Sequence, residues 1–199
     1  MTEALLQTTY FGPVQWYQKL YRFDRCLIEQ CDSYQKQTFR NRCVIATANG
    51  PQALTVPVEH NDAQLVKDLR ISDHNQWRRV HWNALQSAYS ESPFFEYYAD
   101  DIRPFFERKY TFLVDFNEEI RQKICELADI QPCIDYTTDY QPTHDRDFRD
   151  VIHAKRPQPD ADFSPRPYWQ VFQHRYGFQP NLSILDLLFC MGPEAVFYL

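Results

Sequence analysis

Residues 26–46 read Cys-Leu-Ile-Glu-Gln-Cys-Asp-Ser-Tyr-Gln-Lys-Gln-Thr-Phe-Arg-Asn-Arg-Cys-Val-Ile-Ala. One short apolar run ends at Glu29 and a second begins directly after Arg42, which predicts two buried strands joined by a polar connection. The connection and the start of the second strand carry three cations, Lys36, Arg40 and Arg42. Because side chains alternate along a strand, Arg40 and Arg42 are expected to share one face, which meets either solvent or an anion.

The bulk composition places this cationic stretch in an acidic protein. The chain has 199 residues and a formal net charge of -6, so a local group of cations stands against the overall sign. A hydrophobic content of 44% is enough for a full core, and the length predicts a single domain over residues 1–199. The acidic balance disfavours general nucleic-acid binding and docking on an anionic membrane.

Several classes of protein and of site are disfavoured by what the sequence lacks. No stretch has the length and apolarity of a membrane span, and the N-terminus lacks the features of a signal peptide, so a cytoplasmic protein is expected. The six cysteines form no C-x-x-C pair and no zinc-finger spacing with histidine. The four glycines are too far apart for a Walker loop or a dinucleotide fingerprint. The sequence therefore predicts neither a metal nor a cofactor.

The N-terminal half predicts a small mixed sheet. A strand over 5–9, a helix over 13–23 and a strand over 25–30 form a βαβ-like start, whose two strands we expect to be parallel. Asn49-Gly50 between two apolar runs predicts an antiparallel hairpin of 42–47 and 53–58. A further strand is expected over 66–71. These elements indicate an α/β fold, with α+β as the alternative.

The C-terminal half predicts helices that pack on this sheet. Apolar residues at helical spacing indicate helices over 75–89, from 92 to about 102, and over 115–128. Residues 181–189 predict a largely buried helix capped by Asn181. Between these helices, residues 137–167 are rich in proline and charge and lack periodicity, so they are expected to form a long loop that is either disordered or a functional lid.

The clustered cations are the first candidate for a binding site. Lys36, Arg40 and Arg42, together with the Asn41 amide, suit a phosphate or carboxylate, because guanidinium groups bind such anions bidentately and amides complete the hydrogen bonding. Tyr10 is a candidate for lining the same pocket, with core packing as the alternative. The competing interpretation of the cations is a set of solvated charges or ion pairs with the protein's own acids.

Three further residues have two possible roles each. Glu29, at the end of an apolar strand, is a candidate general base or an ion-pair partner for Arg42. His81, among aromatic residues on a predicted helix, is a candidate proton shuttle or a core histidine. Asp186, on the last predicted helix, could pair with Arg40 or Arg42 and so give these arginines a purely structural role.

Several of these stretches resemble the WbqC-like protein family. Tyr10-Phe11-Gly12-Pro13 resembles the family's opening Gln-Pro-x-Tyr-Phe-Pro-Trp motif, although Thr8 and Thr9 stand in place of Gln-Pro and Gly12 in place of proline. The resemblance continues through the 36–42 stretch, through Leu-Thr-Val-Pro-Val at 54–58, and through 181–189 with Gly192. The middle, 77–98, is similar to the version common in Bacteroidetes. The resemblance covers nearly the whole chain.

The resemblance implies a bacterial cytosolic protein linked to O-antigen or other surface-polysaccharide biosynthesis, and it carries no catalytic residues over. Three hypotheses follow. The first is a group transferase acting on a small anionic intermediate such as a nucleotide-sugar, with Lys36, Arg40 and Arg42 holding the anion and Glu29 or His81 moving the proton. The second is a non-catalytic binding or assembly protein. The third is a structural role for the cations.

Overall fold

A three-stranded parallel sheet organises the N-terminal part of the protein. The computed structural model describes residues 2–59 and 64–199. Its parallel strands are β1 (Glu3–Gln7), β2 (Arg25–Glu29) and β7 (Ile134–Tyr136), in the order β1-β2-β7. Helix α1 (Val14–Arg22) connects β1 to β2, which confirms the predicted βαβ start. Strand β1 begins two residues before the predicted position, and β7 was not predicted.

The antiparallel strands form two separate pairs. The predicted hairpin is present as β3 (Arg42–Thr47) and β4 (Gly50–Thr55), although β4 begins and ends three residues before the predicted 53–58. The next strand, β5 (Val58–Glu59), pairs with β6 (Arg70–Ile71). The strand predicted over 66–71 is wrong in its first half, where the chain makes a 3-10 turn, η1 (Val66–Asp68). Parallel and antiparallel strands thus occupy small sheets of their own within the described residues, and the α/β class is confirmed.

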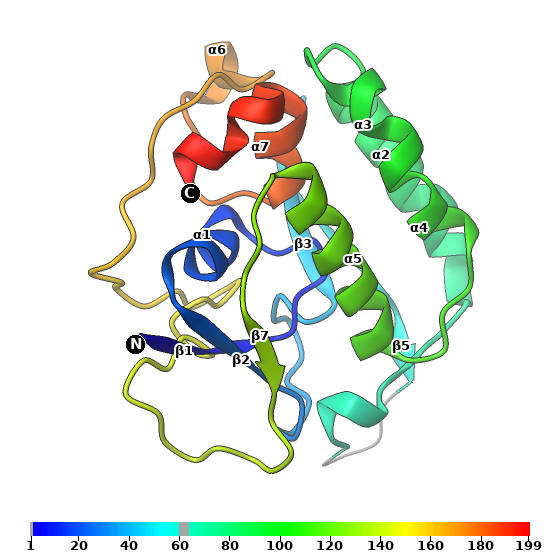
Figure 1. The fold of residues 1–199 in the computed structure, drawn as a ribbon. Helices are drawn as coiled ribbons and strands as arrows, with labels where there is room; N and C mark the ends of the chain where they lie inside the picture. The colour runs from blue at the N-terminus through cyan, green and yellow to red at the C-terminus, as the bar shows by residue number, and fades with distance from the viewer. Residues whose placement is uncertain (1, 60–63) are drawn as a thin grey trace.

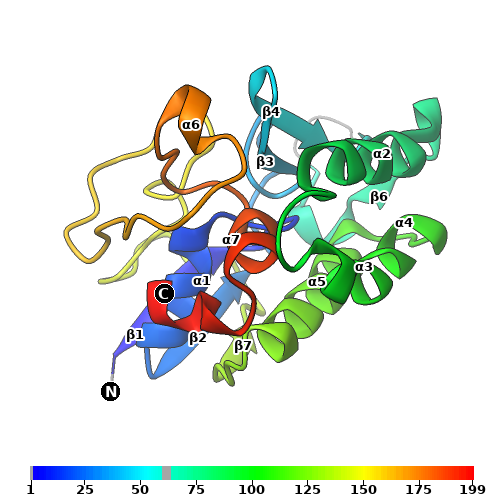
Figure 2. The same ribbon diagram turned by 90° about the horizontal axis from the view of Figure 1, so that it is seen from above.

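Helices cover these sheets, as the C-terminal periodicity predicted. They are α2 (Trp77–Tyr89) with the preceding 3-10 turn η2 (His74–Gln76), α3 (Phe95–Ile102), α4 (Pro104–Glu107), α5 (Leu113–Leu127), α6 (Gln173–Tyr176), α7 (Ile184–Met191) and the 3-10 helix η3 (Gly192–Tyr198). On α5, Phe116, Ile120 and Ile124 form the expected buried stripe. Helix α7 is buried along most of its length because it lies between α1 on one side and α2 and α3 on the other (Figure 2).

Helix α7 is hydrogen-bonded at its start to the stretch Tyr10-Phe11-Gly12-Pro13, which follows β1. The Ser183 hydroxyl donates to the Phe11 carbonyl at 2.8 Å, and the Ile184 amide donates to the Gly12 carbonyl at 2.9 Å. The predicted cap of this helix is corrected: Ser183, not Asn181, is the N-cap, and its hydroxyl accepts from the Leu185 amide. The Asn181 side chain instead accepts a hydrogen bond from the Gln15 amide of α1.

A long irregular segment, residues 137–172, follows β7 and contains the predicted Pro-rich loop. It is tied to the free edge of β1, because the Leu5 amide donates to the Arg146 carbonyl and the Phe148 amide donates to the Leu5 carbonyl, each at 2.9 Å. Figure 1 and Figure 2 both place this segment on the side of the molecule away from α2, α3 and α4. The segment therefore extends the sheet locally without forming a full strand.

Two glycines with positive φ allow a controlled test of the packing around α7. Gly192 (φ 58°) lies where an added Cβ would be 2.6 Å from the Phe94 ring, whereas an added Cβ on Gly177 (φ 69°) would meet nothing within 4 Å. Gly192→Ala and Gly177→Ala should both lose about 1–2 kcal/mol of stability from backbone strain. Gly192→Ala should lose about 1–3 kcal/mol more, because the Phe94 ring must move. Urea unfolding of both variants measures this difference, and equal losses would contradict the packing described for α7 and η3.

Candidate functional site

A polar cavity of about 440 Å³ opens where β2 ends. Ligand crevices in α/β proteins form at the carboxyl ends of parallel strands, so this position agrees with the general rule. We call it the β2-end cavity. It combines the connection after β2 with the irregular segment, and it is lined by Cys31, Asp32, Ser33, Gln35, Arg40, Tyr140, Pro142, Asp147, Arg149 and Asp150.

Glu29, a predicted catalytic residue, lies fully buried behind this cavity. Its carboxylate accepts hydrogen bonds from the Cys31 amide at 2.8 Å, the Thr137 hydroxyl at 2.7 Å and the Gln141 amide at 3.1 Å. It also forms an ion pair with Arg149 at 3.2 Å. Both oxygens are occupied by the protein itself, so the partner of Glu29 is Arg149 and not Arg42 as the ion-pair interpretation expected.

Arg149 connects Glu29 to the cavity. Besides Glu29, it donates to Asp147, with its Nη2 atom 2.6 Å from Oδ2 and its Nε atom 3.0 Å from Oδ1. The hydrogen bonds that Arg149 donates to Asp147 raise the pKa of Arg149, against the opposing effect of burial. The guanidinium group also lies 5.3 Å from the centre of the Tyr140 ring. One arginine therefore contacts two carboxylates and one aromatic ring, of which Asp147 and Tyr140 line the cavity.

Asp32 and Arg40 form a second ion pair in the lining. Both are buried, and Arg40 donates through Nη2 to Oδ2 of Asp32 in a close ion pair. Among the described residues, the other carboxylate oxygen of Asp32, Oδ1, is buried and has no hydrogen-bond partner. Burial raises the pKa of Asp32, whereas the charge of Arg40 acts in the opposite direction. A carboxyl group that combines burial, a free oxygen and a raised pKa is suited to proton transfer.

The other predicted substrate-binding residues of the 36–42 stretch lie outside the lining. Lys36 is exposed, in a turn directly after Gln35. Asn41 is buried and donates to the Val56 carbonyl at 2.8 Å, and Arg42 donates through Nε to the Thr55 hydroxyl at 3.1 Å. Arg40 and Arg42 do not share a strand face as predicted, because β3 begins only at Arg42 and Arg40 lies in the preceding turn.

Tyr10 and His81 meet each other in the aromatic core, away from the β2-end cavity. The Tyr10 hydroxyl lies 2.9 Å from Nδ1 of His81, and both side chains pack against Trp77. Burial raises the pKa of Tyr10 well above its usual value and lowers the pKa of His81 to about 4. The structure thus places this pair among the rings of Phe11, Phe106 and Phe116 and not beside Arg40.

The proposed pairing of Asp186 with an arginine is wrong. Asp186 is fully buried and accepts hydrogen bonds from the Tyr89 hydroxyl at 2.8 Å, the Tyr168 hydroxyl at 2.7 Å and the Gln170 amide at 2.8 Å. Burial raises its pKa. Three neutral donors therefore satisfy this carboxyl group and join α7 to α2 and to the irregular segment. Asp186 therefore does not give Arg40 or Arg42 a structural role.

Sequence reasoning missed Arg149 and Asp147 and gave Asp32 no role of its own. Asp32 follows the apolar run of β2 by three residues, which is a signal for the carboxyl end of a strand. Arg149 lies 120 residues from its partner Glu29, and no local pattern connects them.

Two further classes of feature are absent from residues 2–59 and 64–199. This part of the chain contains no group of three or more His, Cys, Asp or Glu side chains arranged to hold a metal ion. None of its helices combines the length and the apolarity needed to cross a membrane.

The pKa of His81 gives a pH-dependent prediction. Because the folded-state pKa, about 4, is below the ordinary value of 6.5, neutral His81 contributes stability that is complete above pH 6.5 and is lost as the pH falls toward 4. The loss should reach roughly 3 kcal/mol for a shift of this size. Denaturant unfolding between pH 7 and 4 should therefore show a flatter profile for His81→Gln than for the wild type. The exposed His174, changed to Gln, is the matched control, and a profile for His81→Gln as steep as that of the wild type would contradict the prediction.

Comparison with known proteins agrees with the resemblance noted in the motifs. The sequence model of the WbqC-like protein family matches residues 7–158. The protein described as "Uncharacterized protein Rv1507c", from Mycobacterium tuberculosis (strain ATCC 25618 / H37Rv), is 30% identical to this chain over an alignment of 224 residues. The alignment covers 98% of this chain and 96% of the relative. No solved structure matches the chain. The family match spans β2, the 36–42 stretch and Arg149, and the chain therefore belongs to the WbqC-like protein family.

Proposed function

We propose that this protein is a cytoplasmic group-transfer enzyme whose active site is the β2-end cavity. Its substrate is an anionic intermediate, a nucleotide-sugar or a related carboxylate-bearing sugar, of bacterial surface-polysaccharide biosynthesis. The family resemblance supports the biosynthetic setting. The observation that carries the catalytic part is the Asp32 carboxyl group, which is buried beside Arg40 and keeps one oxygen without a partner in the described structure.

Asp32 takes the role of proton acceptor in this proposal. Glu29 is less suited, because each of its oxygens already accepts hydrogen bonds that hold the irregular segment. His81 is less suited, because it is buried in the aromatic core and does not line the cavity. Desolvation of Asp32 makes its proton affinity higher than that of an exposed aspartate, which is the direction that a general base near neutral pH requires.

Arg40 and Arg149 position the anionic group of the substrate. A guanidinium group has five N–H donors, and the ion pairs with Asp32, Asp147 and Glu29 use only some of them. These pairs fix the orientation of both arginines before a ligand arrives, which lowers the entropic cost of binding. Lys36 follows Gln35 of the lining, and its positive charge would attract the anionic substrate toward the cavity.

The proposed reaction is a single transfer. The acceptor hydroxyl or amine of one substrate gives its proton to Asp32 while its oxygen or nitrogen forms a bond to the transferred group. The bond between that group and its phosphate or carboxylate leaving group breaks, and the leaving anion departs with the bonding electron pair, stabilised by Arg40 and Arg149. The two guanidinium groups stabilise the charge of the leaving anion electrostatically, and the atoms and charges of this step balance without a metal ion.

A non-catalytic binding or assembly protein is the second candidate. It is favoured by one observation: Arg40 and Arg149, the two cations of the lining, are already paired with carboxylates of the protein. In that case the cavity would recognise hydroxyl groups of a sugar through its carboxylates, and Asp32 would have no chemical step to perform.

Asp32→Asn tests the proposal. The amide keeps a hydrogen bond to Arg40 and removes the base, so turnover should fall by about 10² to 10⁴-fold while ligand binding is kept. Turnover is measured by mass spectrometry of mixtures of nucleoside-diphosphate sugars with amine and hydroxyl acceptors, and binding by thermal shift with the same sugars. Asp100→Asn, an exposed aspartate on α3, is the matched control.

The outcomes separate the two candidates. Turnover by the wild type that disappears in Asp32→Asn, but not in Asp100→Asn, supports the enzyme. A thermal shift without turnover that Asp150→Asn weakens favours the binding protein, because Asp150 is an exposed carboxylate of the β2-end cavity. Neither shift nor turnover with any of the sugars would overturn the proposal.

A further inference from the structure

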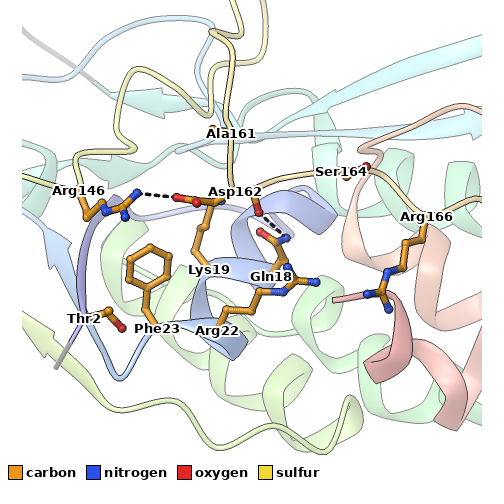
Figure 3. A pocket seen from close by; sticks show the side chains of 10 residues that line it. All are labelled: Thr2, Gln18, Lys19, Arg22, Phe23, Arg146, Ala161, Asp162, Ser164 and Arg166. Carbon is orange, nitrogen blue, oxygen red and sulfur yellow. Dashed lines mark hydrogen bonds and ion pairs between the residues drawn. The ribbon is translucent and has the colours of Figure 1, made fainter.

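A second cavity, of about 520 Å³, lies at the opposite end of the parallel sheet. It is bounded by the last turns of α1, by Thr2 before β1, and by residues 161–166 of the irregular segment. Because β1 and β2 are parallel, the residue before β1 and the residues after β2 mark opposite ends of the sheet. We call this the α1 cavity, and Figure 3 shows the side chains that surround it.

The α1 cavity gathers positive charge in an acidic protein. Lys19, Arg22, Arg146 and Arg166 line it, and Asp162 is the carboxylate of the lining. The β2-end cavity shows the reverse balance, with two arginines and three aspartates. Like charges brought together repel one another unless a counter-charge is present. The α1 cavity therefore favours an anionic ligand.

Two of these cations form ion pairs with aspartate side chains, and the other two form none with an Asp or Glu side chain. Lys19 is fully buried and lies 2.6 Å from Asp160, and Arg146 lies 2.7 Å from Asp162. Neither Arg22 nor Arg166 forms an ion pair with an Asp or Glu side chain of the described residues. Arg22 and Arg166 are therefore the cations of the lining that no Asp or Glu side chain of the described residues neutralises.

Both unpaired arginines are held in place by single hydrogen bonds. Arg22 donates through Nη2 to the Leu199 main-chain oxygen at 2.9 Å, and Arg166 donates through Nη1 to the Phe197 carbonyl at 2.7 Å. Figure 3 shows that Arg22 comes from α1 and Arg166 from the irregular segment on the other side. Each guanidinium group keeps further N–H donors, so the pair can bind one ligand from two directions.

A buried amide adds an acceptor to these donors. Gln18 is 2% exposed and donates through Nε2 to the Asp162 carbonyl at 3.0 Å. Its Oε1 atom is buried and has no hydrogen-bond partner among the described residues. An acceptor of this kind suits a hydroxyl group of the ligand, because a buried polar atom left unpaired costs free energy. The ring of Phe23, also in the lining, offers an apolar face nearby (Figure 3).

We propose that the α1 cavity binds a diphosphate-bearing ligand, with the phosphate oxygens between Arg22 and Arg166. A diphosphate supplies negative charge and several hydrogen-bond acceptors, and a sugar or nucleoside attached to it would supply a hydroxyl for Gln18 and a surface for Phe23. The volume falls within the range of small-molecule sites. This site goes beyond the proposed active site and does not depend on it.

Calorimetric titration with inorganic pyrophosphate and with uridine diphosphate tests the site. Arg22→Gln and Arg166→Gln, which change two different walls, should each weaken binding about tenfold or more, because each removes charge-assisted hydrogen bonds. Arg79→Gln, an exposed arginine on α2, makes the same change of net charge and should leave binding within about twofold of the wild type. Thermal melting confirms that each variant is folded, and either wall variant alone is sufficient for the test.

The binding results either support the α1 cavity as a diphosphate site or overturn it. Equal weakening of both probes by the wall variants shows that the diphosphate is recognised by itself, and tighter binding of uridine diphosphate shows that the nucleoside also contributes. Failure of both probes to bind, or binding that Arg22→Gln and Arg166→Gln leave unchanged, would overturn the site. Weakening by Arg79→Gln to the same degree would also overturn it. Asp32→Asn should not alter this binding, so a failure here is distinct from a failure of the proposed active site.

Discussion

The buried carboxylate of Glu29 joins the end of β2 to a segment that has no regular structure of its own. It accepts hydrogen bonds from Thr137 and Gln141 and pairs with Arg149, so three points of residues 137–149 meet at one side chain. A buried carboxylate that lost these partners would carry a large desolvation cost. The segment therefore has one favourable position on the sheet. Without that position, the wall that supplies Tyr140, Asp147 and Arg149 to the β2-end cavity would not exist.

The same segment also builds the second cavity, and the backbone pairing at Leu5 explains how. Arg146 and Asp147 are consecutive, and each lines a different cavity. Successive side chains of an extended chain point to opposite faces, so pairing with the edge of β1 directs one to each side. The two cavities consequently differ in charge, one rich in carboxylates and one rich in cations. The irregular segment thus contributes side chains to both cavities.

The predictable part of the fold was local. The βαβ start, the hairpin and the stripe on α5 follow from periodicity within short windows, and the structure contains them. Strand β7 was missed because three residues carry little periodicity and its pairing with β2 spans about half the chain. In the candidate site, Arg40 was found from its unusual charge, but its partner Asp32 and the Glu29–Arg149 pair depend on tertiary contacts. Arg22 and Arg166 escaped notice because they lie far apart in the sequence, and only the fold brings them to one cavity.

Glu29 holds the irregular segment in place on the sheet, and amide hydrogen exchange measures this directly. In the wild type, the amides of Gln141 and Phe148 should be protected, because one donates to Glu29 and the other to Leu5. Glu29→Gln should speed exchange across residues 137–149 and leave α5 and α7 as protected as before. Fast exchange of this segment in the wild type, or unchanged protection in Glu29→Gln, would contradict the account.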